Sequence, residues 1–152
     1  MTTSCHFAVE DLRAAFHFLA DEERLKICPF LRYQEWDKGH ILMKEDDLAD
    51  YMVFVISGKL AIKKQTAFPG KFTLVGMLEE GAMAGEATVL DRGRRVATVE
   101  VVEKCRLFVL RSDDFDKLLE VQPTLGITII RRMLHVVGIR LRKAGERLAQ
   151  LL

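Results

Sequence analysis

Residues Gly85–Val99, GEATVLDRGRRVATV, hold two charged residues in surroundings that are otherwise small or apolar. Glu86 follows a glycine and precedes small side chains, and Arg95 opens an apolar run nine positions later. Charged side chains are almost never fully buried unless something pairs with them. This stretch therefore predicts a pocket in which Glu86 and Arg95 meet a ligand or each other.

The residue types in this stretch suit a nucleotide. A glycine followed by a short helical turn exposes backbone N–H groups, here near Ala87 and Thr88, and such groups bind anions. Arg95 can donate a bidentate pair of hydrogen bonds to a phosphate, and the carboxylate of Glu86 can accept one from a sugar hydroxyl. An internal Glu86–Arg95 salt bridge explains the same residues, so the stretch alone leaves both interpretations open.

The overall composition indicates one globular domain, residues 1–152. Hydrophobic residues make up 49% and charged residues 30% of the chain, which is typical of folded rather than disordered proteins. The net charge of +1 gives no electrostatic case for nucleic-acid binding. No apolar run approaches the roughly 20 residues of a membrane span, and the N-terminus lacks a signal-peptide pattern. We therefore expect a cytoplasmic protein that contacts neither membrane nor nucleic acid.

The cysteines and histidines give little support for a metal centre. Cys5, Cys28 and Cys105 are odd in number and far apart, so we expect buried free thiols rather than a disulfide framework, a zinc site or a four-cysteine cluster. The four histidines include no HxH or HExxH pair, which argues against a metal-dependent cupin enzyme. A haem ligand at His40 or His135 stays open.

The periodicity of the chain predicts helices at both ends and strands between them. Helical spacing covers residues 8–30 and stops at Pro29. Short apolar or alternating runs separated by turn signals such as Ser57-Gly58 then predict a sandwich, barrel or jelly roll over about residues 33–110. The expected strands are His40–Met43, Tyr51–Ile56, Lys59–Lys63, Phe72–Met77, Val96–Val102 and Arg106–Leu110.

Residues 112–152 predict two helices, a short one and a long one. Ser112 is the expected N-cap of the short helix, and Pro123 fits the first turn of the long helix. The long helix carries apolar residues at alternating spacings of three and four, a coiled-coil type of seam. The seam consists of Ile127, Ile130, Leu134, Val137, Leu141, Ala144, Leu148 and Leu151.

This seam has two interpretations. It can be the buried face of an amphipathic helix packed on the β domain, or it can pair with the same helix of a second copy in a homodimer. The length of the seam favours the homodimer. Gly138 and Gly145 lie beside it and would permit close approach of a second helix or of a ligand.

Several ordered motifs resemble the cyclic-nucleotide-binding domain family, as found in bacterial regulators of the catabolite-activator type. Gly85-Glu86, Val89-Leu90 and Arg95–Val99 resemble the family's phosphate-binding cassette, which reads roughly F-G-E-x-A-L-L, a variable loop, then R-A-A-T-V. KGHILMKEDDLADYMVFVISGKLAI, residues 38–62, resembles the preceding strands of the family, and KCRLFVLRSDDFDKLLEVQPTL, residues 104–125, resembles its passage from strand to helix.

The resemblance implies a fold that is mainly β with flanking helices: a cupin-like β-roll with N-terminal helices and a long C-terminal helix. It implies that Glu86, with Gly85, binds the ribose. The cyclic phosphate is expected at Arg95, with Ala87, Thr88 and Val96 beside it. The base is expected near the final helix, whose candidate residues are Arg140, Leu141, Ala144 and Gly145.

The function implied is a non-enzymatic sensor whose ligand is cAMP or another 3′,5′-cyclic nucleotide. Because Val96 supplies no hydroxyl, cAMP is expected rather than cGMP. The chain ends after the long helix without a winged helix-turn-helix, so we expect no DNA contact and an output through the dimer or an unknown partner protein. The alternative is a scaffold of the same fold that binds no nucleotide and serves dimerisation.

Overall fold

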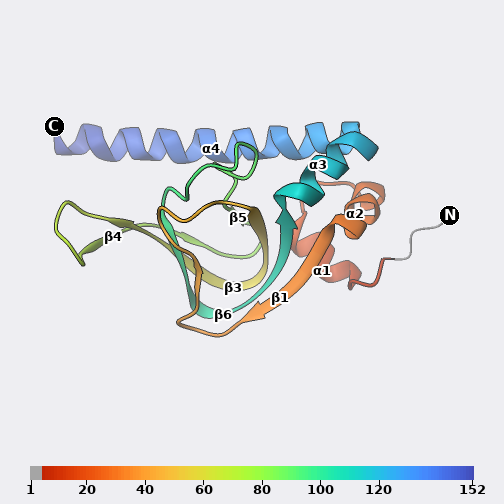
Figure 1. Ribbon diagram of the computed structural model, residues 1–152, viewed down its shortest axis with the longest axis horizontal. Coiled ribbons are helices and arrows are strands. Elements are labelled where there is room, and N and C mark those ends of the chain that lie inside the picture. Colours follow the sequence, from red (N-terminus) through yellow and green to blue (C-terminus); the bar gives the residue numbers. More distant parts are fainter. Residues whose placement is uncertain (1–4) are drawn as a thin grey trace.

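The computed structural model describes residues 5–152 and contains an antiparallel β-roll with helices on either side of it in the chain (Figure 1). The predicted fold class is therefore confirmed. The strands are β1 (Leu31–Trp36), β2 (Ile41–Met43), β3 (Tyr51–Gln65), β4 (Phe72–Leu78), β5 (Met83–Ala84) and β6 (Thr98–Arg111). The helices are α1 (Val9–Ala15), α2 (Asp21–Ile27), the single 3-10 turn η1 (Cys28–Phe30), α3 (Ser112–Val121) and α4 (Pro123–Leu151).

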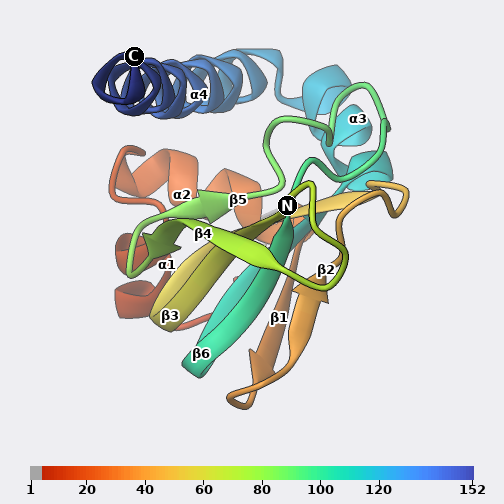
Figure 2. The same cartoon turned by 90° about the vertical axis from the view of Figure 1, so that its left-hand side faces the viewer.

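The two longest strands, β3 and β6, form the centre of the sheet. They pair with each other, and the sheet order is β1-β6-β3-β4, with β2 on β6 and β5 on β3. Figure 2 shows these strands curving around a common interior, with α4 lying across the top of the roll. Helix α4 thus faces the curved sheet, and the end of β5 lies between them (Figure 2).

The sequence predicted four short strands where the structure has two long ones. The runs Tyr51–Ile56 and Lys59–Lys63 belong to the single strand β3, and the last two predicted strands merge into β6. The expected turn at Ser57-Gly58 is instead a bulge at which the β3–β6 register shifts. Gly58 adopts φ +94°, and a Cβ there would lie 2.2 Å from the carbonyl oxygen of Lys104. Glycine is therefore required for the bulge rather than for a chain reversal.

Strand β3 is buried on both of its faces, which explains why its sequence is continuously apolar. Side chains of a strand alternate between faces, so Met52 and Phe54 pack against the helices while Val53 and Val55 fill the interior of the roll. Burial of this kind contributes about 25 cal/mol per Å² of apolar surface. The two apolar clusters fix β3 and, through it, β5 and the loop that follows.

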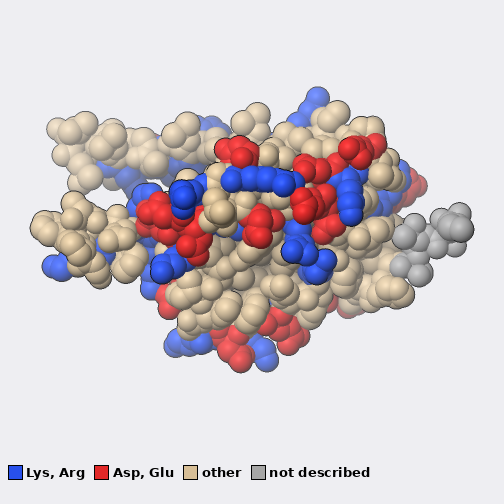
Figure 3. Space-filling view, viewed as in Figure 1, with Lys and Arg blue, Asp and Glu red and all other residues tan. Residues whose placement is uncertain are grey.

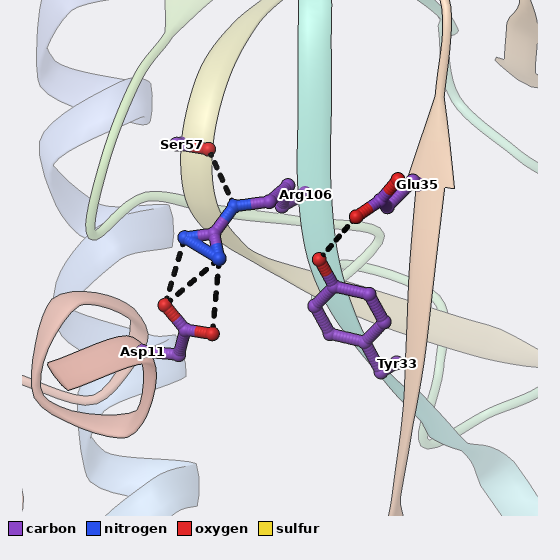
Figure 4. Close-up of polar contacts among 5 residues, drawn as sticks. All are labelled: Asp11, Tyr33, Glu35, Ser57 and Arg106. Atoms are coloured by element: carbon purple, nitrogen blue, oxygen red, sulfur yellow. Dashed lines mark hydrogen bonds and ion pairs between the residues drawn. The ribbon is translucent and has the colours of Figure 1, made fainter. Parts of the chain in front are cut away.

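An ion pair attaches helix α1 to the roll at the same bulge (Figure 4). The guanidinium of Arg106, on β6, donates to both carboxylate oxygens of Asp11 at 2.7–3.0 Å and to the hydroxyl of Ser57 at 3.2 Å. On neighbouring β1, the hydroxyl of Tyr33 donates to Glu35 at 2.7 Å. Burial and the adjacent Glu35 raise the pKa of Tyr33.

The expectation of free thiols is wrong for two of the three cysteines. Cys5 and Cys28 form a disulfide with their Cα atoms 5.7 Å apart. Although 23 positions separate them, the chain reverses between α1 and α2, and this brings the segment before α1 beside η1. Sequence spacing does not reveal such a reversal. Cys105 is a buried free thiol as expected.

The passage into the C-terminal helices differs from the prediction at one residue. Ser112 is the first residue of α3, and its hydroxyl donates to the carbonyl of Val89 at 2.9 Å instead of capping the helix. Pro123 does lie in the first turn of α4, as predicted.

Helix α4 packs on the core only through its first three turns. Leu125, Ile129 and Met133 are buried in the cluster shared with the N-terminal helices, and Ile130 is half-buried beside them. A buried core face therefore explains only the beginning of this helix. Farther along, Leu134, Leu148 and Leu151 are exposed, whereas Val137, Leu141 and Ala144 face the roll across the cavity described below.

Candidate functional site

A cavity of about 620 Å³ lies between the roll and α4. Its walls come from four parts of the chain: strand β2, the β3–β4 hairpin, the segment from β5 into β6, and α4. The lining residues are Met43, Ile62, Lys64, Val75, Gly76, Met77, Leu78, Ala84, Gly85, Glu86, Ala87, Thr88, Arg95, Val96, Ala97, Val99, Val137, Arg140, Leu141, Lys143, Ala144 and Arg147. All predicted phosphate and ribose residues are among them, and so are all predicted base residues except Gly145.

Arg95 is a buried cation held in a fixed position. Its side chain is only 4% exposed, one guanidinium nitrogen donates to the carbonyl of Tyr51 at 2.7 Å, and the guanidinium lies 4.6 Å from the ring centre of Tyr51. Backbone bonds to Asp46 and Asp47, 2.9 and 2.7 Å long, fix the main chain on both sides of Arg95. Burial lowers the pKa of Arg95 from its ordinary value. Its Nη1 is buried, and no residue in the described range 5–152 forms a hydrogen bond with it.

Glu86 is the matching buried acceptor. It is 7% exposed, and its Oε1 accepts a hydrogen bond from Nη1 of Arg140, which reaches across from α4. Its Oε2 is buried and has no partner among the described residues. Because an unsatisfied buried polar atom costs about 1–3 kcal/mol, such atoms require an explanation.

The salt bridge that the sequence left open, between Glu86 and Arg95, is not formed. No ion pair joins these two residues within the described part of the chain, and Glu86 pairs with Arg140 instead. One wall of the cavity therefore offers a free carboxylate oxygen and a free guanidinium N–H. Together they can bind a ligand that donates a hydrogen bond at one point and carries negative charge at another.

Gly85 allows the backbone to approach Arg95 closely. It adopts φ +86°, and a Cβ added there would lie 2.6 Å from Nη1 of Arg95 and 3.0 Å from the carbonyl oxygen of Tyr51. The residues after it form a succession of turns rather than an assigned helix, with Ala87 exposed and Thr88 buried. The requirement for glycine and small residues in this cassette is thus steric.

The neighbouring arginines are engaged elsewhere. Arg94 is exposed and donates to the carbonyl of Asp46 at 2.8 Å, while Arg92 pairs with Asp113 and Asp116 on α3. Arg94 is thus exposed while Arg95, the next residue, is buried in the cavity wall.

Sequence reasoning missed four residues that contribute to the site, three in the cavity wall and one behind it. Tyr51 holds the guanidinium of Arg95, and Lys64, Lys143 and Arg147 add positive charge. Lys143 and Arg147 stand three and seven positions after Arg140, a spacing that places them on one side of a helix, and this signal was available. No local signal links Tyr51 or Lys64 to the site, because both arrive through the pairing of distant strands.

Residues 5–152 contain neither a candidate metal-binding cluster nor a candidate membrane-spanning helix. No cluster of three or more His, Cys, Asp or Glu side chains is placed to hold a metal ion. None of the described helices combines the length and apolarity needed to cross a membrane.

Comparison with known proteins gives consistent matches. The profile described as "Cyclic nucleotide-binding domain" matches residues 33–122. The mouse potassium/sodium hyperpolarization-activated cyclic nucleotide-gated channel 3 is 30% identical over 118 residues, which are 77% of this chain and 14% of the channel. The chain thus spans a small part of that relative.

Two solved bacterial structures resemble the whole chain. A cyclic nucleotide-binding domain from Methylobacillus flagellatus has a TM-score of 0.82 at 22% identity, covering 95% of this chain and 82% of that one. The catabolite activator protein of Thermus thermophilus has a TM-score of 0.74 at 27% identity, covering 93% of this chain and 62% of that one.

Proposed function

The chain belongs to the cyclic nucleotide-binding domain family, and we propose that it is a regulatory sensor that binds a 3′,5′-cyclic nucleotide in the cavity beneath α4. The observation that carries the proposal is the pair of unpartnered buried atoms, Oε2 of Glu86 and Nη1 of Arg95, in the wall of one cavity. A ribose hydroxyl and a phosphate are the groups that would satisfy them.

In this proposal the cyclic phosphate lies against Arg95. Nη2 of the guanidinium already donates a hydrogen bond to the carbonyl of Tyr51, and Nη1 donates to a phosphate oxygen. Ala87 and Thr88 supply backbone N–H groups, and Val96 lies beside the phosphate without donating to it. The burial of Arg95 strengthens the interaction, because charges attract more strongly where water is excluded.

The ribose binds on the other side of the cassette. Its 2′-hydroxyl donates to Oε2 of Glu86, beside Gly85, while Oε1 remains with Arg140. The base then extends toward α4, where Arg140, Leu141 and Ala144 line the cavity. Gly145 does not line it, so we leave that residue out of the base contact.

Among the cyclic mononucleotides we propose a preference for cAMP over cGMP. Val96 is 57% exposed at the cavity wall and supplies no hydroxyl group. The branched apolar side chain therefore cannot form a hydrogen bond with the ligand, and nothing at this position favours the additional polar groups of cGMP.

The signal leaves through α4, which we propose pairs with α4 of a second copy. Ligand binding can shift the position of α4 only by binding one arrangement more tightly than another, and the Glu86–Arg140 pair connects ligand and helix directly. The seam residues that are exposed and do not line the cavity, Leu134, Leu148 and Leu151, support a homodimer, whose output is read by an unknown partner protein. We include in the proposal a cytoplasmic location, a regulatory rather than enzymatic role and no nucleic-acid contact by this chain.

A dimerisation scaffold that binds no nucleotide is the second candidate. The observation that favours it is that Arg140 already occupies one oxygen of Glu86, so part of the acceptor is satisfied by the protein itself. In that case the protein would act by dimerising through the seam of α4, and the cavity would bind no nucleotide.

Calorimetric titration with cAMP and cGMP decides between the two candidates. We expect binding by the parent protein and a loss of about 30- to several-thousand-fold in Arg95→Ala, because removing one member of a buried charged pair costs about 2–5 kcal/mol. Arg94→Ala is the matched control and should bind like the parent. Absence of binding by the parent supports the scaffold, and binding that survives Arg95→Ala rejects the placement of the phosphate.

A further inference from the structure

The cavity beneath α4 carries more positive charge than a cyclic mononucleotide requires. Five of its lining side chains are cationic and one is a carboxylate; the cations are Lys64, Arg95, Arg140, Lys143 and Arg147. Figure 3 shows Lys and Arg side chains gathered in the notch between the C-terminal half of α4 and the β3–β4 hairpin. A single cyclic phosphate brings only one negative charge.

Two of the five cations are already neutralised by the protein. Arg140 pairs with Glu86, and Nζ of Lys64 lies 2.8 Å from a carboxylate oxygen of Glu45 while it also donates to the carbonyl of Val96. Arg95, Lys143 and Arg147 form no ion pair with any described residue within 4.0 Å. With one phosphate assigned to Arg95, two cations remain.

These two cations are arranged as one site. Lys143 and Arg147 stand four positions apart on α4, so their side chains are neighbours on the helix surface, and both line the cavity. One nitrogen of Arg147 donates to the carbonyl of Val75 on β4 at 2.7 Å. This bond joins the side chain of Arg147 to the β4 side of the cavity and leaves its other N–H groups available.

We propose that the ligand carries a second anionic phosphate, which Lys143 and Arg147 bind while Arg95 binds the first. This inference rests on the proposed function, since it assigns the first phosphate and the ribose as above. Cyclic dinucleotides are the class that carries two phosphodiesters, each linking one ribose to the other, and with 3′,5′ linkages they keep a free 2′-hydroxyl on each ribose. Arginine and lysine beside each other suit a phosphate, the first by bidentate hydrogen bonding and the second as a point charge.

The test is calorimetric titration of the parent protein with cyclic di-GMP, cyclic di-AMP and cAMP, repeated on Lys143→Ala/Arg147→Ala. We expect at least one dinucleotide to bind more tightly than cAMP, and the double variant to lose about 10-fold or more of that affinity while its affinity for cAMP changes by less than about 3-fold. Dinucleotide binding should also weaken more steeply with salt, because more charge is involved.

Arg131→Ala/Arg142→Ala is the matched control, since it removes the same charge from the same helix at positions that do not line the cavity. An equal loss in that control would show a net-charge effect and overturn the inference. Binding of cAMP alone, or dinucleotide binding unchanged in Lys143→Ala/Arg147→Ala or in Arg95→Ala, also overturns it and leaves the proposed function standing. Absence of binding by every cyclic nucleotide overturns both.

Discussion

Glu86, in the loop after β5, and Arg140, in the middle of α4, form an ion pair that joins the two walls of the cavity. Arg140 also donates to the carbonyl of Met83 at 2.6 Å, so one side chain satisfies two acceptors of the roll. Beyond the buried first turns of α4, one other hydrogen bond joins this helix to the roll in the described residues. Arg147 donates it to the carbonyl of Val75. The position of the helix therefore depends on a residue that faces the ligand site.

Arg140→Ala should loosen α4 and destabilise the domain. The substitution leaves Glu86 as a buried carboxylate without a partner, which costs about 1–3 kcal/mol. We expect a lower free energy of unfolding in urea and faster hydrogen exchange in residues 134–151. Arg142→Ala is the control, because its only described bond is a 3.5 Å contact with the carbonyl of Gly138. Unchanged exchange in Arg140→Ala would show that the pair does not hold the helix.

Gly85→Ala should damage the site and the fold together. The new Cβ would meet Nη1 of Arg95 at 2.6 Å, and the backbone angle of +86° disfavours any side chain. We expect a loss of about 1–3 kcal/mol in stability and weaker binding of cAMP. Gly39→Ala separates the two causes, since Gly39 has φ +96° but open space around it. If both variants lose equally, the strain is in the backbone alone and the contact with Arg95 is not tight.

Local sequence predicted short strands in a sandwich, barrel or jelly roll, and the resemblance of ordered motifs to a known family narrowed this to a β-roll and suggested the roles of the cassette residues. Glu86 and Arg95 are conspicuous in the sequence because they are charged residues in a largely apolar segment. Gly85 is conspicuous because it directly precedes Glu86. Their burial and their place in the cavity wall follow from the strand pairing around them. The partner of Glu86 could not be found in this way. Arg140 is 54 positions away, and its reach depends on the angle at which α4 crosses the roll.

The errors share a physical cause, which is that tertiary contacts override a local signal. Ser57-Gly58 has the composition of a turn, yet pairing with β6 converts it into a bulge. Ser112 has the side chain of an N-cap, yet its hydroxyl finds the carbonyl of Val89. The seam of α4 looks uniform in sequence, yet only the part beside α2 and α3 is covered by this chain.

Reduction of the Cys5–Cys28 disulfide should lower the thermal stability of the domain. The bond closes a loop with a sequence separation of 23, and a loop of this size stabilises the folded state by about 3 kcal/mol through the entropy of the unfolded chain. We expect a lower Tm for the parent in dithiothreitol and for Cys5→Ser without it. Dithiothreitol should leave the Tm of Cys5→Ser unchanged. Two titratable thiols in the native oxidised protein beyond Cys105 would contradict the assignment.

The exposed seam of α4 gives the last prediction, which concerns self-association. Leu134 and Leu148 are 70% and 59% exposed and do not line the cavity, so aspartate at both positions removes no buried contact within one chain. A paired helix would instead bury two unpartnered carboxylates, which is strongly unfavourable. We expect Leu134→Asp/Leu148→Asp to be monomeric by light scattering where the parent is a dimer, with the free energy of unfolding of the single chain changed by less than about 0.5 kcal/mol.

The matched control replaces two exposed apolar residues outside α4, Leu25→Asp/Val121→Asp. It makes the same change in charge and hydropathy and should remain a dimer. If both double variants are monomers, the added surface charge in general prevents dimerisation, and the seam is not the specific dimer interface. A parent protein that is itself monomeric would contradict the dimer directly, and the output of the sensor would then have to pass from α4 to a partner of a different kind.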